Sequence, residues 1–273
     1  MRVFFSDLDG TLLNNEKQVS PRTRQAVDEF VRSGNAFVIS TGRPHGSAIR
    51  LQEKFGLKYP GSYISAHNGA LIYDSSAGKI LYETGIPLDI VPEILRIADW
   101  HKVHVHTYQD IYIVSREYSD ALEFYLGHIP MPLIINKDLL YELEKPPWKM
   151  IGVELRDHGR LQAFHDALLG ELGDVISPVF SDSCYVDIAP VEAGKGNALL
   201  QLCNILNIPV ENSMAAGDNE NDLSMIRAAG LGIAMCNGVD ELKKAADVVT
   251  EQDNNHDGLV PFLTRPQPMD PVS

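Results

Sequence analysis

The stretch Val3-Phe4-Phe5-Ser6-Asp7-Leu8-Asp9-Gly10-Thr11 begins with a short apolar run and ends on two carboxylates and a sharp turn. An apolar run of this length, here Val3 to Ser6, is typical of a strand buried in a sheet, and Gly10 lets the chain turn away. In open parallel sheets, ligand sites lie at the carboxyl ends of the strands. The stretch therefore predicts a site that contains Asp7 and Asp9, although an isolated Asp-x-Asp is more often a simple turn.

The segments on either side of the middle of the chain predict a parallel sheet covered by helices. Ser20 and Pro21 suit the N-cap and first position of a helix whose apolar stripe includes Val27 and Phe30. Further strands are expected at 36–40, 62–66, 213–216, 232–235 and 248–249. Because these strands alternate with helix-like segments, they predict one α/β domain with a Rossmann-like parallel sheet.

Between these segments the pattern changes to antiparallel structure. Residues 71–73 and 80–82 flank Ser75-Ser76-Ala77-Gly78 as the arms of a hairpin. Beyond the hairpin, helices alternate with paired strands, which is typical of a self-contained α+β domain. We therefore expect a discontinuous α/β core domain at 1–85 and 188–273 and an inserted α+β domain at 86–187.

The charge of the chain excludes some classes of partner. The 273 residues carry a formal net charge of -14. This charge would repel the phosphates of a nucleic acid and the surface of an anionic membrane, so neither partner is expected. An acidic protein that binds a small anion must create a local positive potential, with a metal ion and a few cationic side chains.

Cysteine usage and hydropathy predict a cytoplasmic protein. The three cysteines, Cys184, Cys203 and Cys236, are odd in number and widely spaced, as reduced thiols are. The N-terminus leaves no room for a signal-peptide core, and no apolar run approaches the roughly 18 residues of a membrane span. The sequence leaves the oligomeric state open.

Polar side chains follow three further strand ends. Thr41-Gly42-Arg43 offers a hydroxyl, a flexible backbone and a guanidinium to a phosphate group. Gly194-Lys195-Gly196 begins a helix, so an ammonium and free backbone N–H groups can face an anion together. Gly217-Asp218-Asn219-Glu220-Asn221-Asp222 supplies carboxylates, which are hard oxygen ligands suited to Mg²⁺. Phosphate donors and metal ligands are therefore predicted to converge.

Taken in order, these four motifs resemble those of the haloacid dehalogenase superfamily of phosphotransferases, over almost the whole chain. Each motif alone is weak, but four in the family's order are specific. The α+β insert after Asn68-Gly69 resembles the type-IIB cap of the Cof-type branch. His256-Asp257-Gly258-Leu259-Val260 is similar to the closing segment of that branch.

The resemblance implies a role for each motif. Asp7 would be the nucleophile that forms an aspartyl-phosphate, and Asp9 the acid and base. Mg²⁺ would be held by Asp7, the backbone carbonyl of Asp9, and Asp218, with Asp222 and Asn221 completing its shell or orienting its ligands. Thr41 and Lys195 would hold the transferring phosphoryl group and join the catalytic set. The residues assigned to substrate binding are Thr41, Gly42, Arg43, Asn68, Lys195 and Asn221.

The resemblance also implies a Mg²⁺-dependent phosphatase acting on small phosphorylated metabolites, with sugar phosphates expected first. The cap would close over the catalytic face and choose among substrates. A sugar phosphomutase would share all four motifs and stays open. A non-catalytic phospho-acceptor or metabolite sensor would not need Asp9 beside the nucleophile. A dinucleotide-binding protein would carry Gly-x-Gly-x-x-Gly after the first strand, which is missing.

A cluster of histidines in the insert has two interpretations. His104 and His106 alternate so that they share one strand face, with His101 nearby. A zinc site would need a Cys or carboxylate at the usual spacing, and none completes the set. We therefore favour a polar strand face.

Overall fold

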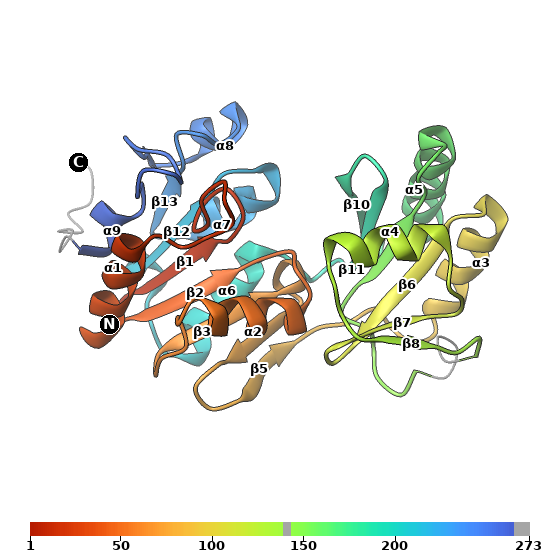
Figure 1. Cartoon of the computed structure of the whole chain (residues 1–273), viewed down its shortest axis with the longest axis horizontal. Helices are drawn as coiled ribbons and strands as arrows, with labels where there is room; N and C mark the ends of the chain where they lie inside the picture. Colours follow the sequence, from red (N-terminus) through yellow and green to blue (C-terminus); the bar gives the residue numbers. More distant parts are fainter. Residues whose placement is uncertain (139–142, 265–273) are drawn as a thin grey trace. The chain divides into compact units, whose positions relative to one another are not determined.

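The computed structural model describes residues 1–138 and 143–264, which form two compact units (Figure 1). The core unit comprises Met1–Gly42, Ala48–Leu81 and the chain from Gly194 onward. The inserted unit comprises Arg43–Ser47 and Tyr82–Ala193. The domain limits expected from the sequence, 86 and 187, fall a few residues inside those of the inserted unit. Sequence periodicity gave no sign that Arg43–Ser47 would group with it.

The core unit is built on one sheet with strand order β14-β13-β12-β1-β2-β3-β4-β5. Its parallel strands are β1 (Val3–Asp7), β2 (Ala36–Ser40), β3 (Ser62–Ala66), β12 (Ser213–Gly217), β13 (Leu231–Ala234) and β14 (Val248–Val249). An edge with β4 (Leu71–Asp74), antiparallel to β3, and β5 (Lys79–Glu83) extends it. The α/β class and the parallel sheet predicted from the sequence are confirmed.

Helices cover this sheet because its buried side chains point to both faces. In β1, Phe4 packs into the cluster that includes Phe37 of β2, whereas the alternate residue Phe5 is buried on the opposite face. The helices of the core unit are α1 (Pro21–Arg32), α2 (His45–Lys54), α6 (Lys195–Ile205), α7 (Leu223–Ala228), α8 (Asp240–Ala245) and α9 (Val260–Thr264). The first three residues of α2 group with the inserted unit. Helix α1 packs beside α9, and α6 beside α7.

The start of α1 shows why these segments are helical. The side chain of Ser20 accepts a hydrogen bond from the N–H of Thr23, and Pro21 occupies the first turn, where its missing N–H costs nothing. Val27 and Phe30 are buried against the sheet. The N-cap and the apolar stripe predicted from the sequence are confirmed.

The inserted unit is an α+β structure with strand order β10-β11-β9-β6-β7-β8. Its strands are β6 (His104–Gln109), β7 (Tyr112–Ser115), β8 (Leu133–Ile135), β9 (Met150–Val153), β10 (Ile176–Asp182) and β11 (Tyr185–Pro190). Its helices are α3 (Val91–His101), α4 (Asp120–His128) and α5 (His158–Leu172). Leu95, Phe164 and Ile188 belong to its hydrophobic core. The sequence pattern predicts helices at 91–100, 121–126 and 161–169 and strands at 103–107, 111–115, 150–155, 175–180 and 184–188. Only β8, which lies in a proline-containing stretch, has no predicted counterpart.

The two histidines of β6 share one face of that strand. The rings of His104 and His106 lie 5.6 Å apart between centroids on one face of β6, as the alternation predicts. Among the described residues, no helix is both long and apolar enough to cross a membrane.

Candidate active site

The register of the central strands brings the predicted motifs to one edge of the core sheet. Asp7, the last residue of β1, pairs with Ser40 of β2, so Thr41 follows directly beside it. On the other side of β1, Ser6 pairs with Ala216 of β12, two residues before Asp218. The carboxyl ends of parallel strands are where ligand sites form in such sheets.

Lys195, the first residue of α6, links two carboxylates of this edge. Its Nζ lies 2.5 Å from Oδ1 of Asp7 and 2.5 Å from Oδ1 of Asp222. The side chains of Lys195 and Asp222 are completely buried. Burial disfavours the ammonium, but Asp7 and Asp222 outweigh it and raise the pKa of Lys195 above its usual value. Lys195 is therefore a buried, positively charged side chain of the site near pH 7.

Three carboxylates crowd around that single cation. Oxygen atoms of Asp7, Asp218 and Asp222 all lie within 4.8 Å of one another. Burial raises the pKa of Asp7 to about 8, with Lys195 opposing the rise and Asp222 adding to it. The pKa of Asp218 is also raised, chiefly by burial. One ammonium cannot compensate three ionised carboxylates, so their joint ionisation is disfavoured unless a further cation is present, and a hard divalent cation fits the donor set.

The loop after β12 fixes Asp222 from both sides. The second carboxylate oxygen of Asp222 accepts hydrogen bonds from the N–H groups of Asp218 and Asn219, at 2.9 and 3.1 Å. Since its first oxygen accepts from Lys195, Asp222 positions that lysine and the loop. Asn221, the residue before it, is exposed. Its predicted metal and substrate roles stay predictions.

The turn after β1 requires a glycine at position 10. Gly10 adopts a φ of +84°, and a Cβ there would lie 2.4 Å from Oδ2 of Asp218. The Asn237 side chain donates to the carbonyl of Gly10 at 2.8 Å, and Thr11 donates to Oδ1 of Asp218 at 2.7 Å. The turn thereby joins the first and last motifs. Sequence reasoning gave Thr11 no role, although it directly follows Asp9-Gly10.

The segment that follows β2 contacts the segment that follows β3, through Thr41, Gly42 and Asn68. Thr41 is buried, and its carbonyl accepts from the N–H of Asn68 at 3.1 Å. A Cβ on Gly42 would lie 2.8 Å from Oδ1 of Asn68, so these two residues are in close approach. Asn68 adopts a φ of 54°, which Asn tolerates better than most residues. The structure thus brings together three of the residues predicted to bind substrate.

Asp9 is more exposed than Asp7, although its charge still acts on Asp218. Oδ1 of Asp9 is 2.8 Å from Nζ of Lys17, and the Asp9 side chain is 35% exposed. Lys17 was not predicted, since nothing in the spacing of Asp9 and Lys17 indicates that the loop between them folds back. Arg43 belongs to the inserted unit, and its role in substrate binding stays a prediction.

The chain is similar to known hydrolases over nearly its whole length. Residues 4–263 match the family described as haloacid dehalogenase-like hydrolases. The 5-amino-6-(5-phospho-D-ribitylamino)uracil phosphatase YitU of Bacillus subtilis is 29% identical over 267 residues, which cover 94% of this chain and 94% of that protein. A haloacid dehalogenase-like hydrolase from Bacteroides thetaiotaomicron has a crystal structure that matches with a TM-score of 0.86 and 28% identity, over 96% of this chain and 98% of that one. The HAD subclass IIB sugar phosphatase BT4131 shares the fold, with a TM-score of 0.78 and 20% identity over 96% of this chain and 98% of that one.

Proposed function

Since this chain belongs to the haloacid dehalogenase-like hydrolases and is a phosphatase, we propose that it hydrolyses small phosphorylated metabolites with Mg²⁺, through an aspartyl-phosphate on Asp7. The family and the enzyme class are those that the four sequence motifs predict. The metal, the covalent intermediate and the substrate class are the proposal.

The observation that carries the proposal is the position of Lys195. Its ammonium is completely buried and lies 2.5 Å from a carboxylate oxygen of Asp7, the residue that ends the central strand. A buried cation at this distance stabilises the Asp7 carboxylate and can offset repulsion between it and a phosphate dianion. Such an arrangement suits a nucleophile better than a structural carboxylate at a turn.

The residues of the chain would carry out both half-reactions. A carboxylate oxygen of Asp7 attacks phosphorus and the bond to the ester oxygen breaks, while Asp9 donates a proton to that leaving oxygen. Asp9 then accepts a proton from the water that attacks phosphorus, and phosphate leaves as Asp7 is restored. Thr41 and Lys195 hold the phosphoryl oxygens. Mg²⁺ held by Asp7, Asp218 and the backbone carbonyl of Asp9 would neutralise charge that develops on the phosphoryl group.

Activity is expected to require Mg²⁺ and to be lost in EDTA. Asp218→Ala should raise the Mg²⁺ concentration for half-maximal activity by about tenfold or more, because it removes one hard oxygen ligand. Calcium should support turnover poorly, since its shell of about 6–8 ligands would engage both oxygens of Asp7. The measurement is phosphate release from an aryl phosphate during metal titration.

A matched control is Asp240→Ala, because this side chain is 90% exposed and lies in α8, outside the carboxylate cluster. It should leave the Mg²⁺ requirement unchanged. Full turnover in excess chelator would contradict the metal assignment.

Sugar and sugar-alcohol phosphates are the expected substrates. A panel of phosphorylated metabolites should include 5-amino-6-(5-phospho-D-ribitylamino)uracil, because YitU is named for it. Phosphate release should equal substrate loss for the preferred compound. If a sugar phosphate were isomerised without net phosphate release, the phosphomutase alternative would replace this proposal, and no turnover at all would favour a phospho-acceptor.

A further inference from the structure

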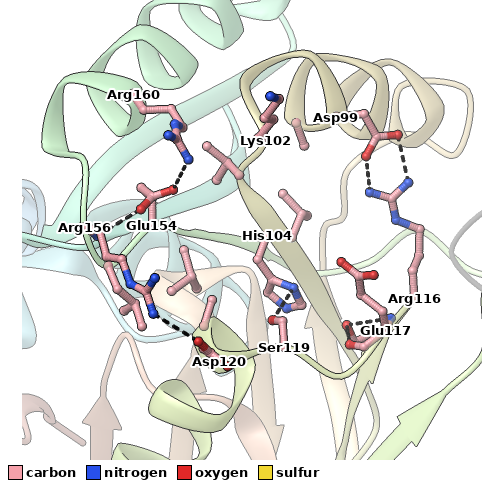
Figure 2. Close-up of a pocket in the computed structure, with 17 residues that line it drawn as sticks. Asp99, Lys102, His104, Arg116, Glu117, Ser119, Asp120, Glu154, Arg156 and Arg160 are labelled. Atoms are coloured by element: carbon pink, nitrogen blue, oxygen red, sulfur yellow. Dashed lines mark hydrogen bonds and ion pairs between the residues drawn. The ribbon is translucent and has the colours of Figure 1, made fainter.

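A polar pocket of about 590 Å³ lies within the inserted unit, at the end of its sheet where β7 and β9 finish (Figure 2). Both strands pair antiparallel with β6, so they run in the same direction on either side of it. After each strand a short loop leads to the N-terminus of a helix, α4 after the Arg116–Ser119 loop and α5 after the Glu154–Asp157 loop. All residues that line the pocket belong to this unit. Its volume is within the range of small-ligand sites.

The lining carries equal numbers of positive and negative side chains. The basic residues are Lys102, Arg116, Arg156 and Arg160, and the acidic residues are Asp99, Glu117, Asp120 and Glu154. The lining thus lacks the excess of acidic residues that gives the whole chain its net charge of -14. The pocket is therefore neutral overall while it offers receptors for both signs of charge.

Three ion pairs bridge parts of this lining (Figure 2). Arg116 donates to both carboxylate oxygens of Asp99, at 2.6 and 3.0 Å. Arg156 lies 3.1 Å from Asp120, and Arg160 lies 3.0 Å from Glu154. The side chains of Arg156 and Asp120 are 82% and 83% exposed. Because water screens such a pair, a ligand can replace either partner at little cost.

Two charged groups of the lining stand outside these pairs. Within residues 1–138 and 143–264, neither the ammonium of Lys102 nor the carboxylate of Glu117 forms an ion pair. Both residues are exposed. They have opposite signs, so a ligand that satisfies both must itself carry one negative and one positive group.

The remaining surface is neutral. His104 lies in the lining, and its Nδ1 is 3.0 Å from Oγ of Ser119, the N-cap of α4. Burial, together with Arg116, lowers the pKa of His104 to about 4, so its imidazole is neutral near pH 7. Val105 and Val153 add apolar surface on the strands. A ligand therefore meets apolar and uncharged surface as well as the two unpaired charges.

We propose that this pocket binds a free α-amino acid, with the ligand carboxylate at the Lys102 side and the ligand ammonium at Glu117. A phosphate dianion or a simple carboxylate fits less well, because it would pair with Lys102 but leave the carboxylate of Glu117 without a counter-charge. An amine without a carboxylate would pair with Glu117 but leave Lys102 unsatisfied.

Calorimetric titration of the full chain with each proteinogenic amino acid tests the proposal. At least one should bind, and Lys102→Gln and Glu117→Gln should each weaken its affinity by about tenfold or more, because each removes one charge-assisted contact. Both positions are exposed, so neither change should unfold the protein. The amine and the carboxylic acid that correspond to the best ligand should each bind more weakly than the amino acid.

Arg96→Gln is the matched control, because Arg96 is an exposed, ion-paired arginine of α3 that does not line the pocket. It should leave the affinity unchanged. Asp7→Asn should also leave it unchanged, which separates this site from phosphate hydrolysis. Absence of binding by every amino acid, equal binding of inorganic phosphate at the same residues, or binding insensitive to both Lys102→Gln and Glu117→Gln would overturn the proposal.

Discussion

Asp7→Asn is expected to lower turnover by more than about a thousandfold, because a neutral amide cannot attack phosphorus. The change is nearly isosteric, and a neutral side chain suits a buried position where burial already raises the pKa of Asp7 to about 8. The fold should therefore persist. Steady-state phosphate release and the thermal unfolding midpoint, measured on the same preparation, test both parts.

The covalent intermediate gives this prediction a second readout. Wild-type protein that is quenched with acid during turnover of a phosphate ester should carry a phosphoryl group on the peptide that contains Asp7. The Asn variant, treated in the same way, should carry none. Asp240→Asn, at an exposed position, is the control for general effects of removing a carboxylate. Retention of a tenth of wild-type activity by pure Asp7→Asn protein would sink the covalent mechanism.

Lys195→Met is expected to reduce both activity and stability. Removing one partner from a buried ion pair typically costs about 3–5 kcal/mol, because the remaining charge is left buried without compensation. Here two carboxylates, those of Asp7 and Asp222, would lose the same ammonium. Urea unfolding should show the loss, and saturating Mg²⁺ should recover part of it if the ion binds the same carboxylates.

The activity of the Lys195 variant distinguishes a catalytic from a structural role. Because Lys195 would contact only the phosphoryl group, which all substrates share, kcat/KM should fall by a similar factor for each member of a substrate panel. Measurements at a temperature where the variant is fully folded keep stability out of the comparison. A changed substrate ranking, with little loss on a generic aryl phosphate, would contradict this assignment.

The local pattern of the sequence was enough to predict most elements of both units. β2 (Ala36–Ser40) and β3 (Ser62–Ala66) begin and end at the residues expected, because an apolar run between polar turns identifies a buried strand locally. β8 (Leu133–Ile135) was missed, since a three-residue strand among prolines carries too little periodic signal. The helix α9 (Val260–Thr264) was missed for the same reason, because five residues carry too little helical periodicity.

For the candidate site, the sequence determined which side chains follow the strand ends, but only the tertiary structure decided which of them meet. Motif order predicted a convergence of Asp7, Lys195 and Asp218, since parallel strands share one edge. It did not separate Asp222, which is buried between Lys195 and two backbone N–H groups, from its exposed neighbour Asn221.

The sequence likewise did not show that Thr11 pairs with Asp218 or that Lys17 pairs with Asp9. Nor did it show that charged residues of the inserted unit line one pocket. Helix and strand periodicity depends on neighbours a few residues apart, so it can be read along the chain. Side-chain partners that are 207 residues apart, as Thr11 and Asp218 are, depend on sheet register and loop conformation. Those are set by the packing of the whole unit, and the sequence by itself does not display them.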